Sequence, residues 1–326
     1  MQKNLTAGKG EKQTNPVLFF LLFIAVLAFV AVIINILTGG VFLESKNVQA
    51  ILSAAIYPSF IAWGLCFLQA CGYTDLSIGG VVVLSSFAAC AFGNMFGYPG
   101  LILGGVITGT VLIFINFNIF AFAKIPSWIA SISLAMIYEA ISVFMRANKT
   151  FRPHVDVELD HSLRAIGQFP INLVVLAIGF VIVYLLYNRT SIGQNIVAVG
   201  GNKNVAKSLG VNVTKTLLLV GLICGVLIGV ASVLQEIFVA KTAAMAGLTS
   251  IQMVFKPLAI ALLAQIIQRW INIIIAVPFC SLIIYGVFNA MAFFGIPSGT
   301  LQDVLLCVFL LAFGMVGQRG VKGVVK

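Results

Sequence analysis

Long apolar runs, separated by short polar segments, make up most of this chain. The hydrocarbon core of a bilayer is about 30 Å thick, and an α-helix needs about 20 apolar residues to cross it. A soluble domain typically has about 25% charged residues, whereas this chain of 326 residues has 9% charged and 61% hydrophobic residues. The sequence therefore predicts an all-α, polytopic membrane protein with about ten (8–10) membrane-spanning helices.

The pattern is clear over most of the chain and weakest over 76–123. There, glycines together with Asn94, Asn116 and Asn118 interrupt the hydrophobicity, so eight or nine spans plus broken helices fit almost as well. The first run is too long for the apolar core of a signal peptide and is expected to remain as an anchor. The expected spans are residues 16–37, 50–72, 76–97, 100–123, 126–146, 171–188, 216–238, 247–268, 271–294 and 300–318.

The positions of lysine and arginine predict the orientation of these spans. With the N-terminus in the cytoplasm, twelve of the nineteen basic residues fall on the cytoplasmic side, as the positive-inside rule requires. Both termini are then cytoplasmic. The expected organisation is a cytoplasmic polar tail (1–15), a transmembrane domain (16–318) with an external loop (147–170) and a cytoplasmic loop (189–215), and a basic cytoplasmic tail (319–326).

The net charge of +10 follows from this topology rather than from a nucleic-acid surface. No basic run interleaved with aromatic residues lies on a soluble segment, so nucleic acid is not an expected partner. Membrane lipid is.

The cytoplasmic loop 189–215 is the longest polar interruption between two apolar runs, and it contains signals for a short helix. Gly200 and Gly201 are expected to break the chain, and Asn202 is a good N-cap residue. Residues 203–209 can form two helical turns, and Gly210 can adopt the left-handed conformation that ends them.

This short helix is amphipathic. Val205 and Leu209 lie on one face at a spacing of four residues, and Lys203 and Lys207 lie on the opposite face. Because isolated helices shorter than about 12 residues are marginal in water, the apolar face is expected to dock into a groove on a partner. A solvated loop is the alternative.

The chain carries no signature of an energy source of its own. Its Gly8–Lys9 pair is followed by Gly10, so it does not form the phosphate-binding P-loop. We expect a transport subunit that is not an enzyme, holds no cofactor, and depends on a partner or an ion gradient. Of the acids near the spans, Glu236 and Asp303 are expected to reach water, which leaves Glu139 as a candidate proton relay.

The cysteines and histidines do not form a convincing metal site. All six cysteines lie in apolar runs and are expected to be small buried residues without a catalytic or metal-binding role. His154 and His161 share the external loop with three acids, which leaves a weak metal site as a less favoured alternative to a solvated loop. No metal is expected.

Three motifs in order resemble the permease subunits of bacterial ABC importers of the ribose, galactose and xylose type. They are TDLSIGG at 74–80, IPSWIAS at 125–131, and SIG at 191–193 leading through VGGN at 199–202 to Gly210 and Val211. The resemblance runs from about residue 50 to the C-terminus. By themselves, Asp75 or Ser77 can cap a helix that starts near Leu76.

The resemblance implies a passive path for a sugar or related polar solute in the bacterial inner membrane. Its implied partners are a cytoplasmic ATPase that uses ATP, an extracytoplasmic binding protein, and a second permease chain. The loop 189–215 corresponds to the element that family members insert into the ATPase. The implied coupling residues are Gly201, Asn202, Lys203, Val205, Ala206, Lys207, Leu209 and Gly210.

Two further sets of residues are candidates for contact with other molecules. An uncharged polyol needs amide, hydroxyl and aromatic partners at mid-membrane, although each such side chain more often bridges two helices than contacts substrate. The path candidates are Gln69, Asn116, Asn118, Tyr138, Glu139 and Asn289. Charges on the external side can orient a docking protein. The docking candidates are Arg146, Arg152, Arg164, Glu236 and Lys241.

The chain departs from the family pattern in two places. Glu139–Ala140 replaces a common Arg–Gly pair, and residues 262–270 replace a glycine-rich stretch. These departures leave open the substrate, and whether the permease dimer contains one kind of chain or two. Two other functions also stay open: an ion-coupled secondary transporter that uses Glu139, and a membrane scaffold without transport activity.

Overall fold

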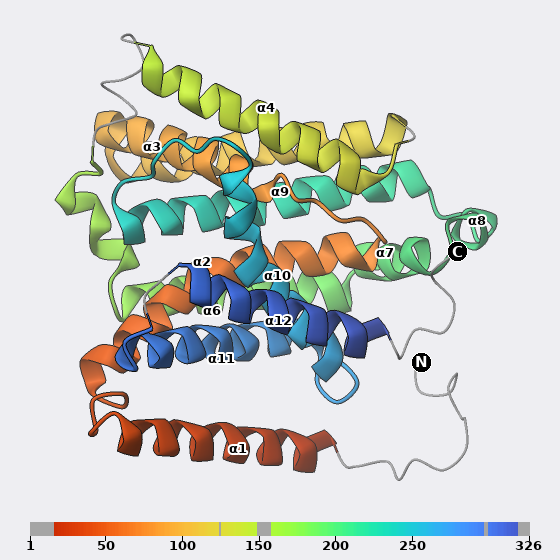
Figure 1. The fold of residues 1–326 in the computed structure, drawn as a ribbon. Helices are drawn as coiled ribbons and strands as arrows, with labels where there is room; N and C mark the ends of the chain where they lie inside the picture. Colours follow the sequence, from red (N-terminus) through yellow and green to blue (C-terminus); the bar gives the residue numbers. More distant parts are fainter. Residues whose placement is uncertain (1–15, 124, 149–157, 297–298, 319–326) are drawn as a thin grey trace.

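The computed structural model describes residues 16–123, 125–148, 158–296 and 299–318. Within these residues the regular structure consists of helices, most of them running nearly parallel or antiparallel in one bundle (Figure 1). The elements are α1 (Pro16–Leu37), α2 (Ser45–Ala70), α3 (Ile78–Phe122), α4 (Ser127–Ala147), the 3₁₀ helix η1 (His161–Gly167), α6 (Ile171–Arg189), α7 (Ser191–Gly201), α8 (Lys203–Ser208), α9 (Val213–Val239), the 3₁₀ helix η2 (Thr249–Ile251), α10 (Gln252–Ile267), α11 (Ile273–Phe293) and α12 (Thr300–Gln318).

Within the described residues, seven helical segments are long and apolar enough to cross a membrane. They are α2, α3, α4, α6, α9, η2 with α10, and α11, while Ile24–Leu37 and Leu301–Val316 are shorter apolar helices. The prediction of an all-α, polytopic membrane protein is confirmed. Most helix ends agree closely with the expected spans, but α2 begins at Ser45 rather than at residue 50.

The 45-residue helix α3 is a hairpin of two helices. Gly97 has φ 70° and ψ −152°, a conformation that interrupts the helix at the position where the expected spans 76–97 and 100–123 separate. Beyond Gly97 the chain folds back on itself. Gly100 packs directly on the carbonyl of Phe92, and Gly104 packs on that of Ala88. Each half therefore runs antiparallel to the other.

Glycines also join the second half of α3 to α9. A Cβ atom on Gly109 would lie 2.7 Å from Cα of Gly229, and one on Gly225 would lie 2.7 Å from Cα of Thr110. Gly105 and Gly109 are four residues apart, as are Gly225 and Gly229. This small-residue spacing lets two helix backbones approach closely in a membrane, where van der Waals contact is the main attraction between helices. We call this contact the glycine seam.

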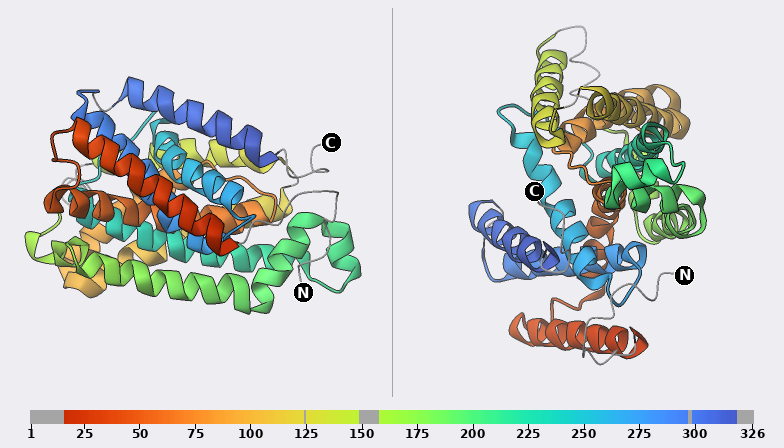
Figure 2. Two further views of the ribbon diagram at one scale, coloured as in Figure 1. Left: turned by 90° about the horizontal axis from the view of Figure 1, so that it is seen from below. Right: turned by 90° about the vertical axis from the view of Figure 1, so that its right-hand side faces the viewer.

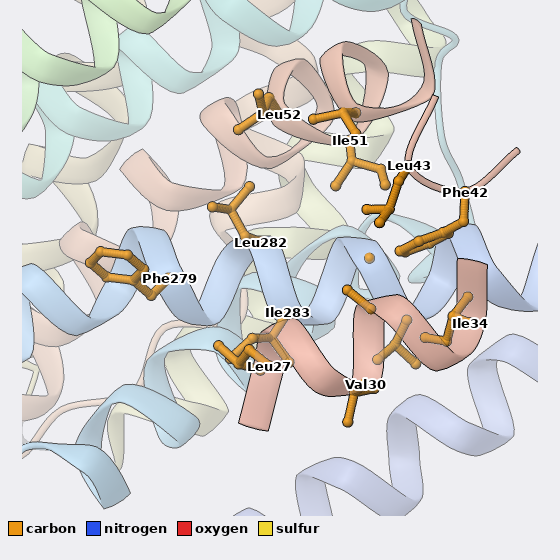
Figure 3. Close-up of a pocket in the computed structure, with 14 residues that line it drawn as sticks. Leu27, Val30, Ile34, Phe42, Leu43, Ile51, Leu52, Phe279, Leu282 and Ile283 are labelled. Atoms are coloured by element: carbon orange, nitrogen blue, oxygen red, sulfur yellow. The ribbon is translucent and has the colours of Figure 1, made fainter. Parts of the chain in front are cut away.

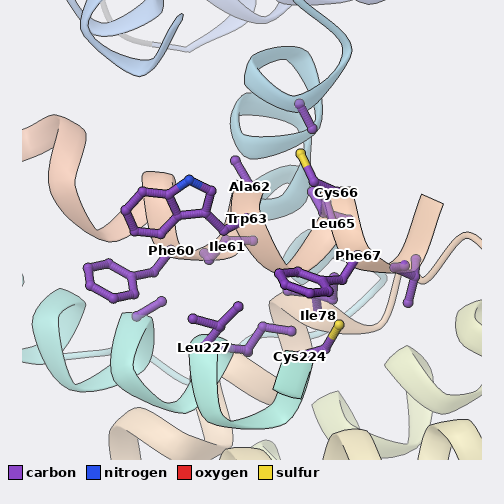
Figure 4. Packing of buried hydrophobic residues seen from close by; sticks show 14 of the residues in the cluster. Phe60, Ile61, Ala62, Trp63, Leu65, Cys66, Phe67, Ile78, Cys224 and Leu227 are labelled. Carbon is purple, nitrogen blue, oxygen red and sulfur yellow. The ribbon is translucent and has the colours of Figure 1, made fainter. Parts of the chain in front are cut away.

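The hydrophobic core lies where α2 crosses α9 and the neighbouring helices. Trp63 and Phe67 are fully buried, and the indole of Trp63 donates a 3.0 Å hydrogen bond to the carbonyl oxygen of Ile274. Ile78, Cys224 and their neighbours fill the same region (Figure 4). Among the described cysteines, five are buried as expected, whereas Cys307 is exposed on α12.

The bundle has two distinct edges and one distinct end. α1 and α4 lie at opposite edges, seen from the side in Figure 1 and from the end in Figure 2. α7 and α8 extend from the end at which α1 begins and α12 finishes. Between the edges, α2, α3 and α9 form the densely packed centre.

We predict that Gly109→Leu destabilises the protein strongly. The added side chain has to displace the backbone of α9 at Gly229, and overpacking of this kind costs about 1–3 kcal/mol or more. Gly314→Leu on α12 is the matched control, since a Cβ atom there meets nothing within 4 Å. Unfolding of the purified proteins in detergent measures the difference, and equal stability of the two variants would contradict the glycine seam.

Candidate functional site: two short helices and a buried polar cluster

The two short helices α7 and α8 form the polar segment between α6 and α9. The expectation that Gly200 and Gly201 break the chain is wrong, because both are the last residues of α7. A Cβ atom on Gly200 would clash with the carbonyl oxygen of Ala70, so glycine is needed there for close packing on the end of α2. The break comes one residue later, at Asn202, which has φ −162° and ψ 115°.

The predicted helix after this break is confirmed. The side chain of Asn202 accepts hydrogen bonds from the backbone N–H groups of Asn204 and Val205, and Gly210 has φ 84°. Ala206 is buried and fixes α8 to the bundle, whereas Val205 is 55% exposed and Leu209 is 75% exposed. Two apolar side chains therefore face away from the protein at its end.

α8 is tied to the loop that connects α2 with α3. The ammonium group of Lys203 donates a 2.8 Å hydrogen bond to the hydroxyl of Tyr73 and lies 4.3 Å from the centre of its ring. This contact belongs to the cation–π type, which is worth about 0.5–1 kcal/mol at an exposed site. Lys203 therefore connects α8 to the loop at residues 71–77.

The same connecting loop ends in a buried polar cluster. Oδ1 of Asp75 accepts hydrogen bonds from the backbone N–H of Ser77 at 2.7 Å and from its hydroxyl at 2.6 Å. The amide of Asn116 donates to Oδ2 of Asp75 at 3.0 Å, and the hydroxyl of Tyr138 donates to Oδ1 of Asn116 at 2.6 Å. The cluster joins the connecting loop, the second half of α3, and α4.

Burial governs the protonation of Asp75. Its side chain is fully buried, and desolvation raises the pKa of the carboxyl above its ordinary value more than the hydrogen bonds from Ser77 and Asn116 lower it. Helix α3 starts at Ile78, with Ser77 in the cap position but without a side-chain cap bond. Asp75 therefore orders the residue just before the helix instead of capping it.

Glu139, next to Tyr138 on α4, fixes the segment of the chain between α9 and α10. Its two carboxylate oxygens accept 2.7 Å hydrogen bonds from the backbone N–H groups of Leu248 and Ser250. These groups precede α10, and Ser142 adds hydrogen bonds to the backbone of Met245. A carboxylate at this position satisfies donors that a helix start otherwise leaves unpaired.

The remaining path candidates bridge helices or bond within one. Gln69 accepts from Gln265, and Asn289 exchanges two 3.0 Å hydrogen bonds with Asn47. Asn118 donates to the carbonyl of Phe114 on its own helix. Asn116, Tyr138 and Glu139 thus come together, whereas Gln69, Asn118 and Asn289 lie apart from them. Next to Glu139, a cavity of about 400 Å³ is lined by residues of α4 and by 246–248.

Lys256 is a residue that sequence reasoning missed. It lies inside α10, with its ammonium group 4.5 Å from the ring centre of Phe288 and 5.7 Å from that of Tyr285. The signal was a lone cation within the expected span 247–268, where ionisable residues are rare and functional by default.

The external candidates differ in accessibility. Arg164 lies 3.9 Å from the carboxylate of Glu158, and Lys241 is exposed. The expectation that Glu236 reaches water is wrong: it is 1% exposed and accepts a 2.6 Å hydrogen bond from Thr242, because the chain turns back over it after α9. Arg152 and His154 lie outside the described residues. Among those that are described, no group of three His, Cys, Asp or Glu residues could hold a metal ion.

We predict that Asp75 makes stability depend on pH. Because its pKa is raised in the folded state, the folded chain binds a proton more readily than the unfolded chain. The contribution of Asp75 to the free energy of unfolding is therefore present at low pH and is lost as pH rises through its raised pKa. Asp75→Asn mimics the neutral acid and should flatten this slope, while the exposed Asp303→Asn should not. Unfolding midpoints measured from about pH 4 upward provide the test, and identical slopes for wild type and Asp75→Asn would contradict it.

Comparison with known proteins gives the family of the chain. A family model described as branched-chain amino acid transport system, permease component, matches residues 47–314. The fructose import permease protein FrcC of Rhizobium meliloti is 30% identical over 62% of this chain and 60% of its own length. The D-allose transport system permease protein AlsC of Escherichia coli is 28% identical over 68% and 69%, respectively.

A third relative, the ribose import permease protein RbsC of Bacillus subtilis, is 26% identical over 62% of this chain and 64% of its own length. The matched part of the chain thus spans less than two thirds of the fructose and ribose permeases. No solved structure matches the chain. Because the family model covers most of the chain, from α2 to α12, the protein belongs to the family of branched-chain amino acid transport system permease components.

Proposed function

We propose that the chain is the permease subunit of an ATP-driven ABC importer and forms the path for a sugar or a related small polar solute. The observation that carries this proposal is the pair of exposed apolar residues, Val205 and Leu209, on a capped helix at the end of the bundle. In a family of transport permeases, such a helix suits docking into a cytoplasmic ATPase. A sugar is favoured over an amino acid because the three relatives named above are fructose, allose and ribose permeases.

The proposed topology has ten crossings and cytoplasmic termini in the bacterial inner membrane. If α3 is counted as two crossings at Gly97, and α1 and α12 each cross once, the described helices supply that number. Six of these crossings separate the N-terminus from α8, so α8 falls on the side of the N-terminus; five precede the loop after α4, and seven precede Lys241. Arg146, Arg164 and Lys241 then lie on the opposite side, where an extracytoplasmic binding protein would dock.

The outward face of α4 is the proposed contact with a second permease chain. Met136 is 57% exposed and Phe144 is 61% exposed, although both flank the buried Glu139. The cavity beside Glu139 opens on this face. A second chain placed here would enclose a path lined by Glu139 and the backbone of residues 246–248, which suits a neutral polyol.

An ion-coupled transporter is the alternative, and the hydrogen bonds that Glu139 accepts weigh against it. A relay carboxylate has to release and bind protons, whereas both oxygens of Glu139 already accept backbone hydrogen bonds. Losing either bond leaves a buried donor unpaired, at about 1–3 kcal/mol.

We predict that Leu209→Glu uncouples ATP hydrolysis from uptake. A charge on the docking face has to be desolvated in the groove of the ATPase, which is strongly unfavourable without a partner charge. Asn204→Glu is the matched control, because Asn204 is exposed on the same helix and points away from the face that carries Val205 and Leu209. Uptake and ATPase rates are measured in proteoliposomes that contain the whole transporter and its binding protein. Normal uptake by Leu209→Glu would contradict docking through α8.

We predict that uptake requires ATP and persists in the presence of a protonophore. Glu139→Gln should lower uptake, since one side-chain oxygen cannot accept from both N–H groups as two do, yet the residual uptake should remain protonophore-insensitive. The exposed Glu44→Gln is the control. Uptake that collapses with the proton gradient would favour the secondary transporter. Unchanged uptake of every sugar after deletion of the protein would favour a scaffold.

A further inference from the structure

A crevice separates α1 from the rest of the bundle. It has a volume of about 300 Å³ and is lined by α1, the turn before α2, the first turns of α2, and α11. Leu27 of α1 lies beside Ile283 of α11, Leu282 of α11 lies on the side of Leu52, and Ile34 and Phe42 lie at the other end (Figure 3). The described side chains that line it are all hydrocarbon.

Polar groups close the crevice at the end where α1 turns into α2. Oδ1 of Asn35 accepts a 2.9 Å hydrogen bond from the backbone N–H of Leu43. The amide of Asn47 donates to the carbonyl of Phe42 at 2.8 Å and pairs with Asn289 on α11. These bonds pair polar groups of the turn and of α2 and α11 with one another.

The surroundings restrict what can fill this space. Water needs two to four polar partners to occupy a cavity, and the lining offers none. The crevice lies between apolar helices of a membrane protein. α1 also exposes apolar side chains on several sides, such as Phe29 at 66% and Ile36 at 72%, and these need lipid contact in any case.

Charges lie at the polar end of the crevice. Glu44 and Lys46 are both exposed beside Leu43, at the start of α2. No side chain caps the first N–H groups of α2, and a helix start with an adjacent lysine favours a phosphate group. The apolar crevice and its charged rim therefore match the two parts of one amphipathic molecule.

We infer that the crevice is a binding site for a membrane phospholipid. One acyl chain lies between α1 and α11, and the phosphate lies near Lys46 at the start of α2. The bound acyl chain supplies the packing that α1 lacks against the bundle, so the lipid holds α1 in place. This inference does not depend on the transported substrate or on the ATPase.

Gly286 on α11 provides a test that leaves the fold intact. It lines the crevice, has ordinary helical geometry, and a Cβ atom added to it meets nothing within 4 Å. Gly286→Phe therefore fills the crevice from within. Gly314→Phe places the same side chain in equally open space on α12, away from the crevice, and is the matched control.

The experiment uses the full chain purified in mild detergent with a phosphatidylglycerol that carries a photoreactive acyl chain. Native mass spectrometry measures retained phospholipid, and peptide mapping locates the cross-links. We expect wild type and Gly314→Phe to retain lipid with cross-links in α1 and α11. Gly286→Phe should retain about tenfold less, equivalent to about 1.4 kcal/mol.

Two results would overturn the inference. One is equal lipid retention and cross-linking by Gly286→Phe and Gly314→Phe. The other is a loss of dimer mass with Gly286→Phe, without lipid in the wild type, which would show that a second copy of the chain occupies the crevice.

Discussion

Close contact between glycines of α3 and α9 is the interaction on which the rest of the structure depends. In hydrocarbon there is no water to drive apolar helices together, so helix association relies on dense van der Waals contact. Gly109 and Gly229 supply this contact by letting the two backbones meet. A tightly joined pair at the centre then gives α2, α4 and α10 fixed surfaces to pack on.

The polar cluster is a consequence of that packing. Once the α3 hairpin is fixed against α9, Asn116 lies where it can bond to Asp75 before the hairpin and to Tyr138 on α4. Buried polar groups in a membrane are costly unless paired, so these bonds in turn hold the connecting loop and α4 in register. The same loop contacts α8 through Lys203. An unbroken set of contacts therefore links the exposed end of the bundle to its centre.

The two edges of the bundle contrast with this rigid centre. α4 is held by the polar cluster and by Glu139, yet it leaves an apolar face uncovered, which suits a protein partner. α1 is held through the turn that follows it, where Asn35 bonds to Leu43 and Asn47 of α2 bonds to Phe42, and the crevice behind it suits a lipid. Different occupants are thus expected at the two edges because the helices there are anchored differently.

The sequence alone determined the class of protein, the positions of most spans, and the capped helix after Asn202, which was expected over 203–209 and spans Lys203–Ser208 in the structure. These are local properties: hydrophobic length, the N-cap at Asn202 and the left-handed Gly210 each depend on a few adjacent residues. It failed at Gly200, whose role is close packing on Ala70, and at Glu236, which the turn directly after α9 buries. Only the tertiary structure decided that Glu139 holds the start of α10 and that Asp75 meets Asn116. Those pairings join residues far apart in the chain, and nearly uniform apolar helices carry little local information about which faces will meet.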